Sequence, residues 1–469
     1  MNRQWIIVVL GAAAATLGRT EDLREVYQRA LAADPTMQQA EYVHLAARET
    51  KTQAILGLLP LDVYAAKNWS GAYSNGTDFA PNIPATLNAA LTVNLFSWSS
   101  WVNFVDADHI VAQAEAAYIA AQEDLISRVA NQYFNVLSAQ DALAAQQIGL
   151  ESAQKQLDQA DKRFEVGLIA ITDVETARAS RDSYTAAVLA AKRTVSTAWD
   201  LLRAITAEDY RELAGPRPDM PLIAPAPASE DQWVGTALQQ NAALTASRLA
   251  ADISHDAYLQ AFGGHLPQVT VSATKAWALA ANVPPVAIVQ GPGGTVSNII
   301  DTRDILWQVG VTVPLFTAGA TQSKVRQAKY TWDAAKAGLE TTRRSTQEQT
   351  QDAYQGVNSQ IAQVVALKQA VESNRVAMEA TDAGYAVGTK NAVDVLTARQ
   401  LLVAAQTSYA QAKYAYLTNY VALWEAAGVL DRAKIDLINS WLAEPAAAPA
   451  ATPPAAAPAA TPPPAAPGS

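Results

Sequence analysis

The sequence predicts an α+β fold built from two copies of one unit, each with two β-strands followed by a long α-helical hairpin. Three observations lead to this fold class. A long motif occurs twice, apolar residues recur at every seventh position over long stretches, and shorter segments alternate between apolar and polar residues. Together they predict four strands and two long hairpins in each chain.

The internal duplication is visible directly in the residues. The segment Arg163–Arg178 matches Gly384–Arg399, because both contain Val-Gly, then Asp-Val, then Ala-Arg at the same spacing. A repeat of this length indicates that one structural unit is built twice. We therefore expect a first repeat over residues 21–215, a Pro/Ala-rich linker over 216–229 and a second repeat over 230–442.

Long helices are predicted from a stripe of apolar residues with a spacing of seven. The stripe comprises Val129, Val136, Leu143, Leu150, Leu157 and Phe164 in the first repeat, and Val357, Val364, Val371, Met378 and Tyr385 in the second. This spacing is typical of helices that pack nearly parallel along a left-handed seam. A helix over residues 99–163 would be about 100 Å long, which exceeds a globular domain. Each repeat should therefore hold a hairpin that turns at its Val-Gly break, with Gly167 and Gly388 making the turns.

Strands are predicted where apolar and polar residues alternate, over residues 86–95, 268–274 and 305–315 and, less regularly, 61–73. Each segment has about the length with which a tilted strand crosses a bilayer. Tryptophans near these segments would suit the aromatic girdles of a membrane barrel; they are Trp69, Trp98, Trp101, Trp277 and Trp307. A soluble β-sandwich could show the same alternation.

Closure of the sheet distinguishes these alternatives. A sheet in a membrane must close on itself, because an open edge leaves backbone groups unsatisfied in lipid. Four strands cannot close, and the eight strands of two chains would enclose only side chains. Three chains supply twelve strands, the first multiple with room for a pore. The membrane interpretation therefore predicts a homotrimer, with a twelve-stranded barrel continued by a tunnel of coiled-coil helices.

The two ends of the chain differ in composition from the rest. Residues 1–20 contain Arg3, an apolar run and small residues, as in a secretory signal peptide. A buried N-terminal helix is the alternative. Residues 443–469 are almost entirely Ala, Pro, Thr and Gly, so we expect a disordered tail without a core.

Composition and motifs favour neither an enzyme nor a nucleic-acid-binding protein. The chain has no cysteine, and its four histidines show no spacing typical of a metal site. Its net charge of −10 argues against a nucleic-acid surface. The segment Gly291–Gly294 lacks the Lys-Ser/Thr of a phosphate loop and is interpreted as an ordinary loop. We therefore expect no catalytic residues, no cofactor and no metal.

The residues also resemble a known family, the TolC-like outer membrane factors. The resemblance is carried by Phe164-x-Val-Gly-Leu-x-Ala-Ile-Thr-Asp-Val-x-x-Ala-Arg178, together with Val26–Gln28, Tyr73–Gly76 and Ala130–Asn135, and it extends over Glu21–Trp441. It implies a trimeric conduit in the bacterial outer membrane that reaches into the periplasm. It also implies docking to a periplasmic adaptor protein and to an inner-membrane ABC or proton-driven transporter, for type I protein secretion or multidrug efflux.

The resemblance further implies that the hairpin tips form a closable periplasmic entrance. The family's latch positions correspond here to Gln156, Asp173, Tyr385 and Lys390. Lys390 stands where related members have arginine, so a forked salt bridge to a carboxylate is not available. Asp394 corresponds to the first of two aspartates that form a cation-attracting ring. Thr397 occupies the second position, which halves the charge of that ring.

Simpler roles remain open for several of these residues. Asp173 and Asp394 stand at the starts of helices, where a carboxylate can cap free N–H groups. Tyr385 continues the heptad stripe, so packing alone could explain it. For the whole chain, the main alternative is a periplasmic adaptor with a coiled-coil hairpin, although adaptors carry one hairpin rather than a duplicated unit. A purely structural coiled-coil protein is disfavoured by the strands.

Overall fold

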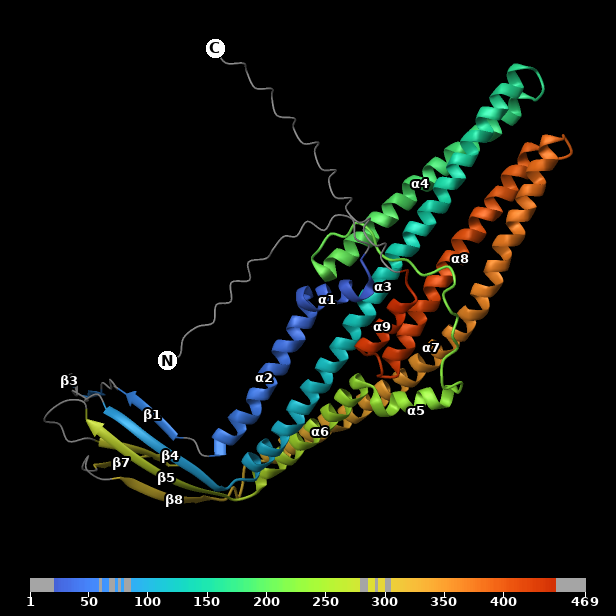
Figure 1. The fold of residues 1–469 in the computed structure, drawn as a ribbon. Coiled ribbons are helices and arrows are strands. Elements are labelled where there is room, and N and C mark those ends of the chain that lie inside the picture. Colours follow the sequence, from blue (N-terminus) through green and yellow to red (C-terminus); the bar gives the residue numbers. More distant parts are fainter. Residues whose placement is uncertain are drawn as a thin grey trace, which may run out of the picture.

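The computed structural model describes residues 21–58, 61–66, 72–74, 77–79, 86–278, 286–291, 294–299 and 305–443. Figure 1 shows a long rod of helices with a β-sheet at one end and two hairpin tips at the other. The predicted signal peptide and nearly all of the predicted tail lie outside the described residues, as does Trp69.

The helices repeat in the same order in the two halves. The first half contains α1 (Leu23–Ala33), α2 (Pro35–Leu58), α3 (Trp98–Glu165) and α4 (Ile171–Thr206). The second contains α5 (Glu230–Gln240), α6 (Ala242–Phe262), the 3₁₀ turn η1 (Gly263–His265), α7 (Ala320–Ala386) and α8 (Ala392–Ala426), followed by α9 (Arg432–Ser440). The long helices α3 and α7 have 68 and 67 residues, and their partners α4 and α8 have 36 and 35. The predicted duplication and hairpins are confirmed.

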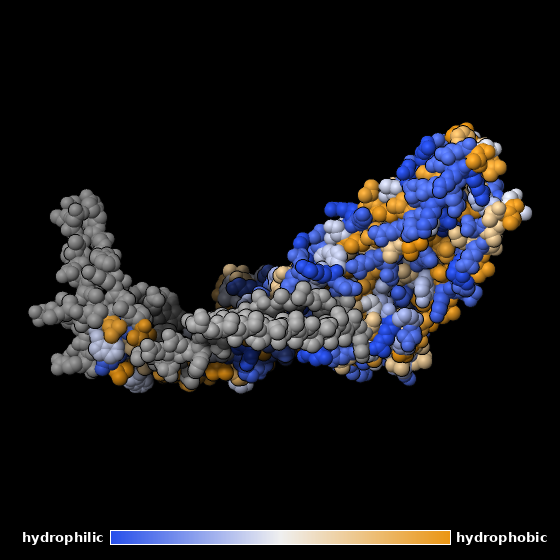
Figure 2. All heavy atoms as spheres, turned by 45° about the horizontal axis from the view of Figure 1, so that its top comes forward, coloured by the Kyte–Doolittle hydropathy of each residue, from blue (hydrophilic) through white to orange (hydrophobic). Residues whose placement is uncertain are grey.

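One four-stranded antiparallel sheet joins the two halves. Its strands are β1 (Leu61–Ala66), β4 (Thr86–Phe96), β5 (Gln268–Ala278) and β8 (Leu306–Thr312), in the order β1-β4-β5-β8. The register pairs Val93 with Val271, and Val271 with Val309, so apolar residues share one face. That face is open in the single chain, with Val309 54% and Trp307 72% exposed. Figure 2 shows hydrophobic residues at the surface of this end of the molecule.

The strands differ from the predicted segments in detail. Strand β8 ends two residues before Pro314, which has no N–H to donate to a ladder. Segment 61–73 is not one strand but β1 and the start of β2 (Ala72–Ser74). Two short hairpins were not predicted: β2 with β3 (Thr77–Phe79), and β6 (Val286–Gly291) with β7 (Gly294–Ile299). Trp98, expected at the membrane interface, instead donates from Nε1 to Leu259 O at 3.0 Å, between α3 and α6.

The core lies in the middle of the rod, where α1, α3, α8 and α9 meet. Tyr133, Phe134 and Tyr416 are completely buried there, and the Tyr133 hydroxyl donates to Ala214 O at 2.7 Å. No helix in the described part of the chain is long and apolar enough to cross a bilayer.

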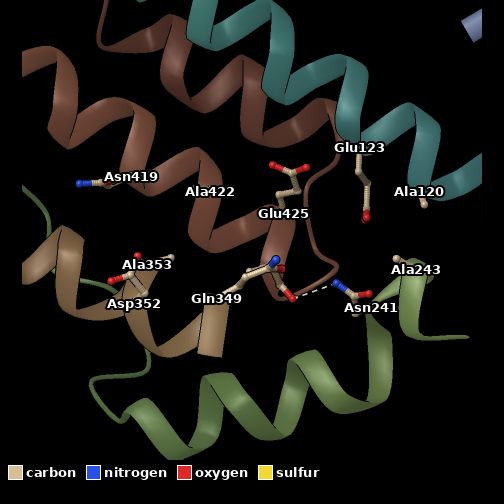
Figure 3. Close-up of a pocket in the computed structure, with 11 residues that line it drawn as sticks. Ala120, Glu123, Asn241, Ala243, Gln349, Asp352, Ala353, Asn419, Ala422 and Glu425 are labelled. Atoms are coloured by element: carbon tan, nitrogen blue, oxygen red, sulfur yellow. Dashed lines mark hydrogen bonds between the residues drawn. The ribbon is translucent and has the colours of Figure 1, made fainter. Parts of the chain in front are cut away.

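Two half-length helices meet end to end at the level of this core. Helix α8 ends where α6 begins, and Asn241 bridges the two (Figure 3). Its side chain accepts from Leu244 N at 2.8 Å and donates to Ala426 O at 3.1 Å. Gly428, with a φ of 69°, fits directly against this joint. A Cβ added to Gly428 would lie 2.6 Å from backbone atoms of Gln240 and Asn241.

At the corresponding start of α2 in the first repeat, a buried carboxylate forms an ion pair with an arginine of α3. Asp34 precedes α2 as Asn241 precedes α6, and only 2% of its surface is exposed. Arg128 Nη2 donates to its Oδ2 at 2.8 Å. Gln349 occupies the position of Arg128 in the second repeat, since both stand equally far before their hairpin glycines. The second repeat therefore has a neutral glutamine where the first repeat has an arginine.

An acidic cavity of about 400 Å³ lies at this level between α3 of the first repeat and the helices of the second (Figure 3). Its lining includes Glu123 from α3, Glu425 from α8 and Gln349 from α7. Burial, together with the nearby Glu425, raises the pKa of the Glu123 carboxyl to about 7. Among the described residues, no basic side chain forms an ion pair with either glutamate.

Candidate functional site

The two hairpin tips share one turn geometry. Gly167 and Gly388 follow α3 and α7 with φ values of 78° and 80°, a left-handed conformation that glycine adopts without a steric cost. Leu168 N donates to Arg163 O and Thr389 N donates to Gly384 O, both at 2.9 Å, which closes the helix ends. The sequence motif and the turn are therefore duplicated together.

Within one chain, two of the predicted latch residues link the first hairpin to the second. Gln156 Nε2 lies 3.5 Å from Ala392 O, to which it donates, and Gln156 Oε1 accepts from Arg399 Nη1 at 3.3 Å. The Arg163 guanidinium lies 4.7 Å from the centre of the Tyr385 ring. A cation over an aromatic face is attracted to it. Gln156 and Tyr385 thus hold the hairpins of one protomer together near the tips.

The other two latch residues have no such contact. Asp173 lies in the first turn of α4, without a side-chain capping bond. Lys390 is exposed beside the turn at Gly388. In the part of the chain that the structure describes, neither forms a side-chain hydrogen bond or an ion pair. Both charges are therefore unpaired within the described residues of the single protomer, and Lys390 is exposed while Asp173 is partly buried.

Asp394 is engaged in a capping box at the start of α8. Asn391 Oδ1 accepts from Asp394 N at 2.8 Å, and Asp394 Oδ2 accepts from Asn391 N at 3.1 Å. The capping role considered from the sequence is thus present. A carboxylate has two oxygens, so this bond still leaves Oδ1 able to face a cation. The Thr397 hydroxyl donates to Val393 O at 2.9 Å and contributes no charge.

Sequence reasoning missed Arg399, although its Ala-Arg motif was part of the duplicated signature. Burial lowers the pKa of its guanidinium, while Asp382 acts in the opposite direction. The matching Arg178 instead pairs with Glu175 on the surface, at 2.6 Å. The same motif position therefore joins the hairpins in one repeat and faces solvent in the other.

Comparison with known proteins agrees with this architecture. The family model described as outer membrane efflux protein matches residues 26–208 and 233–429. The chain is 33% identical to outer membrane protein TolC of Vibrio cholerae, covering 92% of this chain and 97% of that protein. It is 31% identical to TolC of Escherichia coli (92% and 87% covered) and 26% identical to alkaline protease secretion protein AprF of Pseudomonas aeruginosa (89% and 86% covered).

Solved structures show the same fold at lower identity. The outer membrane channel CmeC of Campylobacter jejuni superposes with a TM-score of 0.70 at 18% identity, covering 89% of each chain. The outer membrane protein VceC of Vibrio cholerae gives 0.71 at 21% identity, covering 87% of this chain and 96% of that one. The expected α+β tunnel fold is thereby confirmed.

These matches decide between the functions considered from the sequence. The two matched segments fall within the two halves of the structure, and the family consists of channels rather than adaptors or enzymes. The protein is therefore an outer-membrane channel of secretion or efflux systems that extends into the periplasm, and it is not an enzyme. The chain belongs to the outer membrane efflux protein family.

Proposed function

We propose that three copies of this chain form one export conduit. The observation that carries the proposal is the four-stranded sheet, which has open edges at β1 and β8 and an exposed apolar face. Open edges are not tolerated in lipid, so the sheet must be completed by other copies. Twelve strands would then close into a barrel whose apolar face meets the outer-membrane lipid, while the helices continue the wall into the periplasm.

The domain division inferred from the sequence fits this role. Residues 1–20 would direct export from the cytoplasm, and the repeats at 21–215 and 230–442 would each supply half of the protomer wall. The linker at 216–229 would connect them around the middle of the rod. The tail at 443–469 would remain outside the assembly.

The hairpin tips would meet the partners, a periplasmic adaptor and an inner-membrane ABC or proton-driven transporter. Exposed apolar side chains at both tips support this, since such patches mark interaction sites; Val166 is 70%, Leu168 73% and Val387 75% exposed. Among the relatives, AprF and PrtF are named for protease secretion and BepC for efflux. Both cargo classes are therefore consistent with this duct.

The latch would combine contacts within one protomer with contacts between protomers. Gln156 and Tyr385 fix the two hairpins of one protomer to each other, as their contacts with Arg399 and Arg163 support. Asp173 and Lys390, which have no partner within the described residues of one chain, would reach across to neighbouring protomers. Closure would then depend on pairs between chains, with Lys390 giving a weaker bridge than an arginine.

We expect three copies in the purified particle. Light scattering with the detergent contribution subtracted should give the mass of a trimer, because three sheets are the smallest number that can close around a pore. Planar bilayers containing this particle should show discrete channel openings. A protein that remains monomeric and stable without detergent would contradict the proposed conduit.

Removing the charge of Asp394 should weaken block by multivalent cations added from the periplasmic side, by about tenfold. Three carboxylates near one axis would concentrate cations where the passage is narrowest. Planar-bilayer recording measures this directly.

The Asp394→Asn variant separates charge from capping, because an amide oxygen can still accept from Asn391 N. Thr397→Asp, which would restore a second carboxylate, should strengthen the block. If Asp394→Asn behaves like the unmodified protein while Asp394→Ala only lowers stability, Asp394 is a helix cap and not a ring residue.

A further inference from the structure

A cluster of possible metal ligands joins α3 and α6 close to the sheet, far from the hairpin tips. Asp106 and His109 lie on one face of α3, and Asp256 faces them from α6. One ligand atom from each lies within 4.8 Å of the other two. His109 Nδ1 and Asp256 Oδ2 are hydrogen-bonded at 2.7 Å. The cluster therefore brings one imidazole and two carboxylates to a single point.

The cluster is short of positive charge. Asp256 is only 7% exposed. Asp106 Oδ1 is shielded from solvent and has no hydrogen-bond partner in the described residues. The other basic group nearby, His255, places Nδ1 3.9 Å from Asp256 Oδ1. A buried carboxylate oxygen without a donor is costly unless a cation or proton meets it.

The internal duplication does not explain these residues, because the matching positions of the other repeat mostly carry other residue types. Gln327 and Tyr330 occupy the positions of Asp106 and His109 on α7, at equal distances before the hairpin glycines. Glu49 on α2 corresponds to Asp256, since both stand equally far after Asp34 and Asn241. Helix α7, which corresponds to α3, therefore has neither the aspartate nor the histidine. The ligand set is therefore particular to the contact between α3 and α6, and the internal duplication does not account for it.

We propose that Asp106, His109 and Asp256 bind a divalent transition-metal ion, with Zn²⁺ as the best match. One imidazole nitrogen with two carboxylate oxygens is a zinc-type set, whereas Ca²⁺ and Mg²⁺ prefer oxygen alone. Ligand atoms around tetrahedral zinc lie about 3.3 Å apart, which falls between the 2.7 Å from His109 Nδ1 to Asp256 Oδ2 and the 4.8 Å limit of the cluster. A water molecule would complete the fourth position.

Such an ion would tie α3 to α6 close to the sheet. Helix α3 follows β4 directly, and α6 leads through η1 into β5, so the cluster ties together the two connections into the central strand pair. Trp98, which donates to Leu259 O, already links the same two helices nearer the sheet. The metal would add a second link on the side of the rod.

Cobalt provides a spectroscopic test on the full-length protein in detergent after chelator treatment. Co²⁺ should bind once per chain, with a visible ligand-field spectrum that Zn²⁺ abolishes and a dissociation constant of about 1 µM or below. His109→Ala and Asp106→Asn should each weaken binding at least about tenfold. His44→Ala is the control, because His44 pairs with Glu115 elsewhere and should leave binding unchanged.

A second measurement needs no variant. Zn²⁺ should protect His109 from diethylpyrocarbonate, as read by peptide mass spectrometry, while His44 stays reactive, and it should raise the melting temperature by about 3 °C. Absence of a cobalt spectrum, cobalt binding that survives His109→Ala, or His109 that stays fully reactive in Zn²⁺ would each overturn the proposal. The proposed metal site lies far from the hairpin tips and includes no latch residue, so channel recordings do not test it.

Discussion

Gly428→Ala should destabilise the protomer by more than about 3 kcal/mol and prevent normal assembly. The residue has a φ of 69°, which already disfavours any side chain, and its added Cβ would lie 2.6 Å from the backbone of Gln240 and Asn241. Backbone cannot swing aside as a flexible side chain can, so α6 and α8 would have to separate. Thermal melting of the helical circular dichroism signal, with light scattering for assembly, measures both effects.

Gly388→Ala is the matched control for this prediction. Gly388 has a similar φ of 80°, but nothing lies within 4 Å of its added Cβ. Only the left-handed conformation should then cost stability, about 1 kcal/mol. Equal losses in the two variants would show that conformation alone, rather than close packing at the joint, makes Gly428 necessary.

Arg128→Gln should cost about 3 kcal/mol at neutral pH, because it leaves the buried Asp34 carboxylate without its cation. Burial alone would raise the pKa of Asp34, but the hydrogen bond and charge of Arg128 bring it below its ordinary value. A lowered pKa in the folded state stabilises the protein above the unfolded pKa of about 4, and that stabilisation is lost as the pH falls through the folded value. The cost of Arg128→Gln should therefore diminish in acid.

The other repeat supplies the rescue for this variant. Asp34→Asn combined with Arg128→Gln reproduces the Asn241 and Gln349 of the second repeat, which folds with the same helices. Most of the lost stability should return, with a coupling between the two sites of at least about 1 kcal/mol in a double-mutant cycle. Thermal melting of the unmodified protein, the two single variants and the double variant, at neutral and acidic pH, gives the four stabilities that the cycle needs. A double variant as unstable as Arg128→Gln alone would mean that Arg128 acts by packing or through its ion pair with Asp124, at 2.6 Å, rather than through Asp34.

The hairpins could be predicted because their signal is long and repeated. A heptad stripe continues over many turns, and the Val-Gly break marks both tips, so local irregularities do not hide the pattern. Three of the four main strands could be predicted because one face is apolar over its whole length, whereas β1 covers only the start of a less regular segment. Strands β2 and β3 have only three residues each, which is too short for alternation to be distinguished from chance.

The remaining site contacts depend on residues that are distant in the chain. Gln156 and Arg399 are 243 positions apart, and no local pattern links them. The same holds for His109 and Asp256, which are 147 positions apart. The histidines carried no metal signal in the sequence because the expected spacing is that of one helix, whereas this cluster takes ligands from two.

The end-to-end joint of α8 and α6 has a mechanical consequence for an opening duct. At this level α7 has an unbroken ladder of backbone hydrogen bonds, whereas the ladder is interrupted between α8 and α6, where the bond from Asn241 to Ala426 joins the two ends. Each protomer thus combines two continuous long helices, α3 and α7, with a line of helix, α8 and α6, that is interrupted halfway along. We expect force applied at the hairpin tips to act first at this joint, so that α8 turns while α6 and the sheet keep their arrangement.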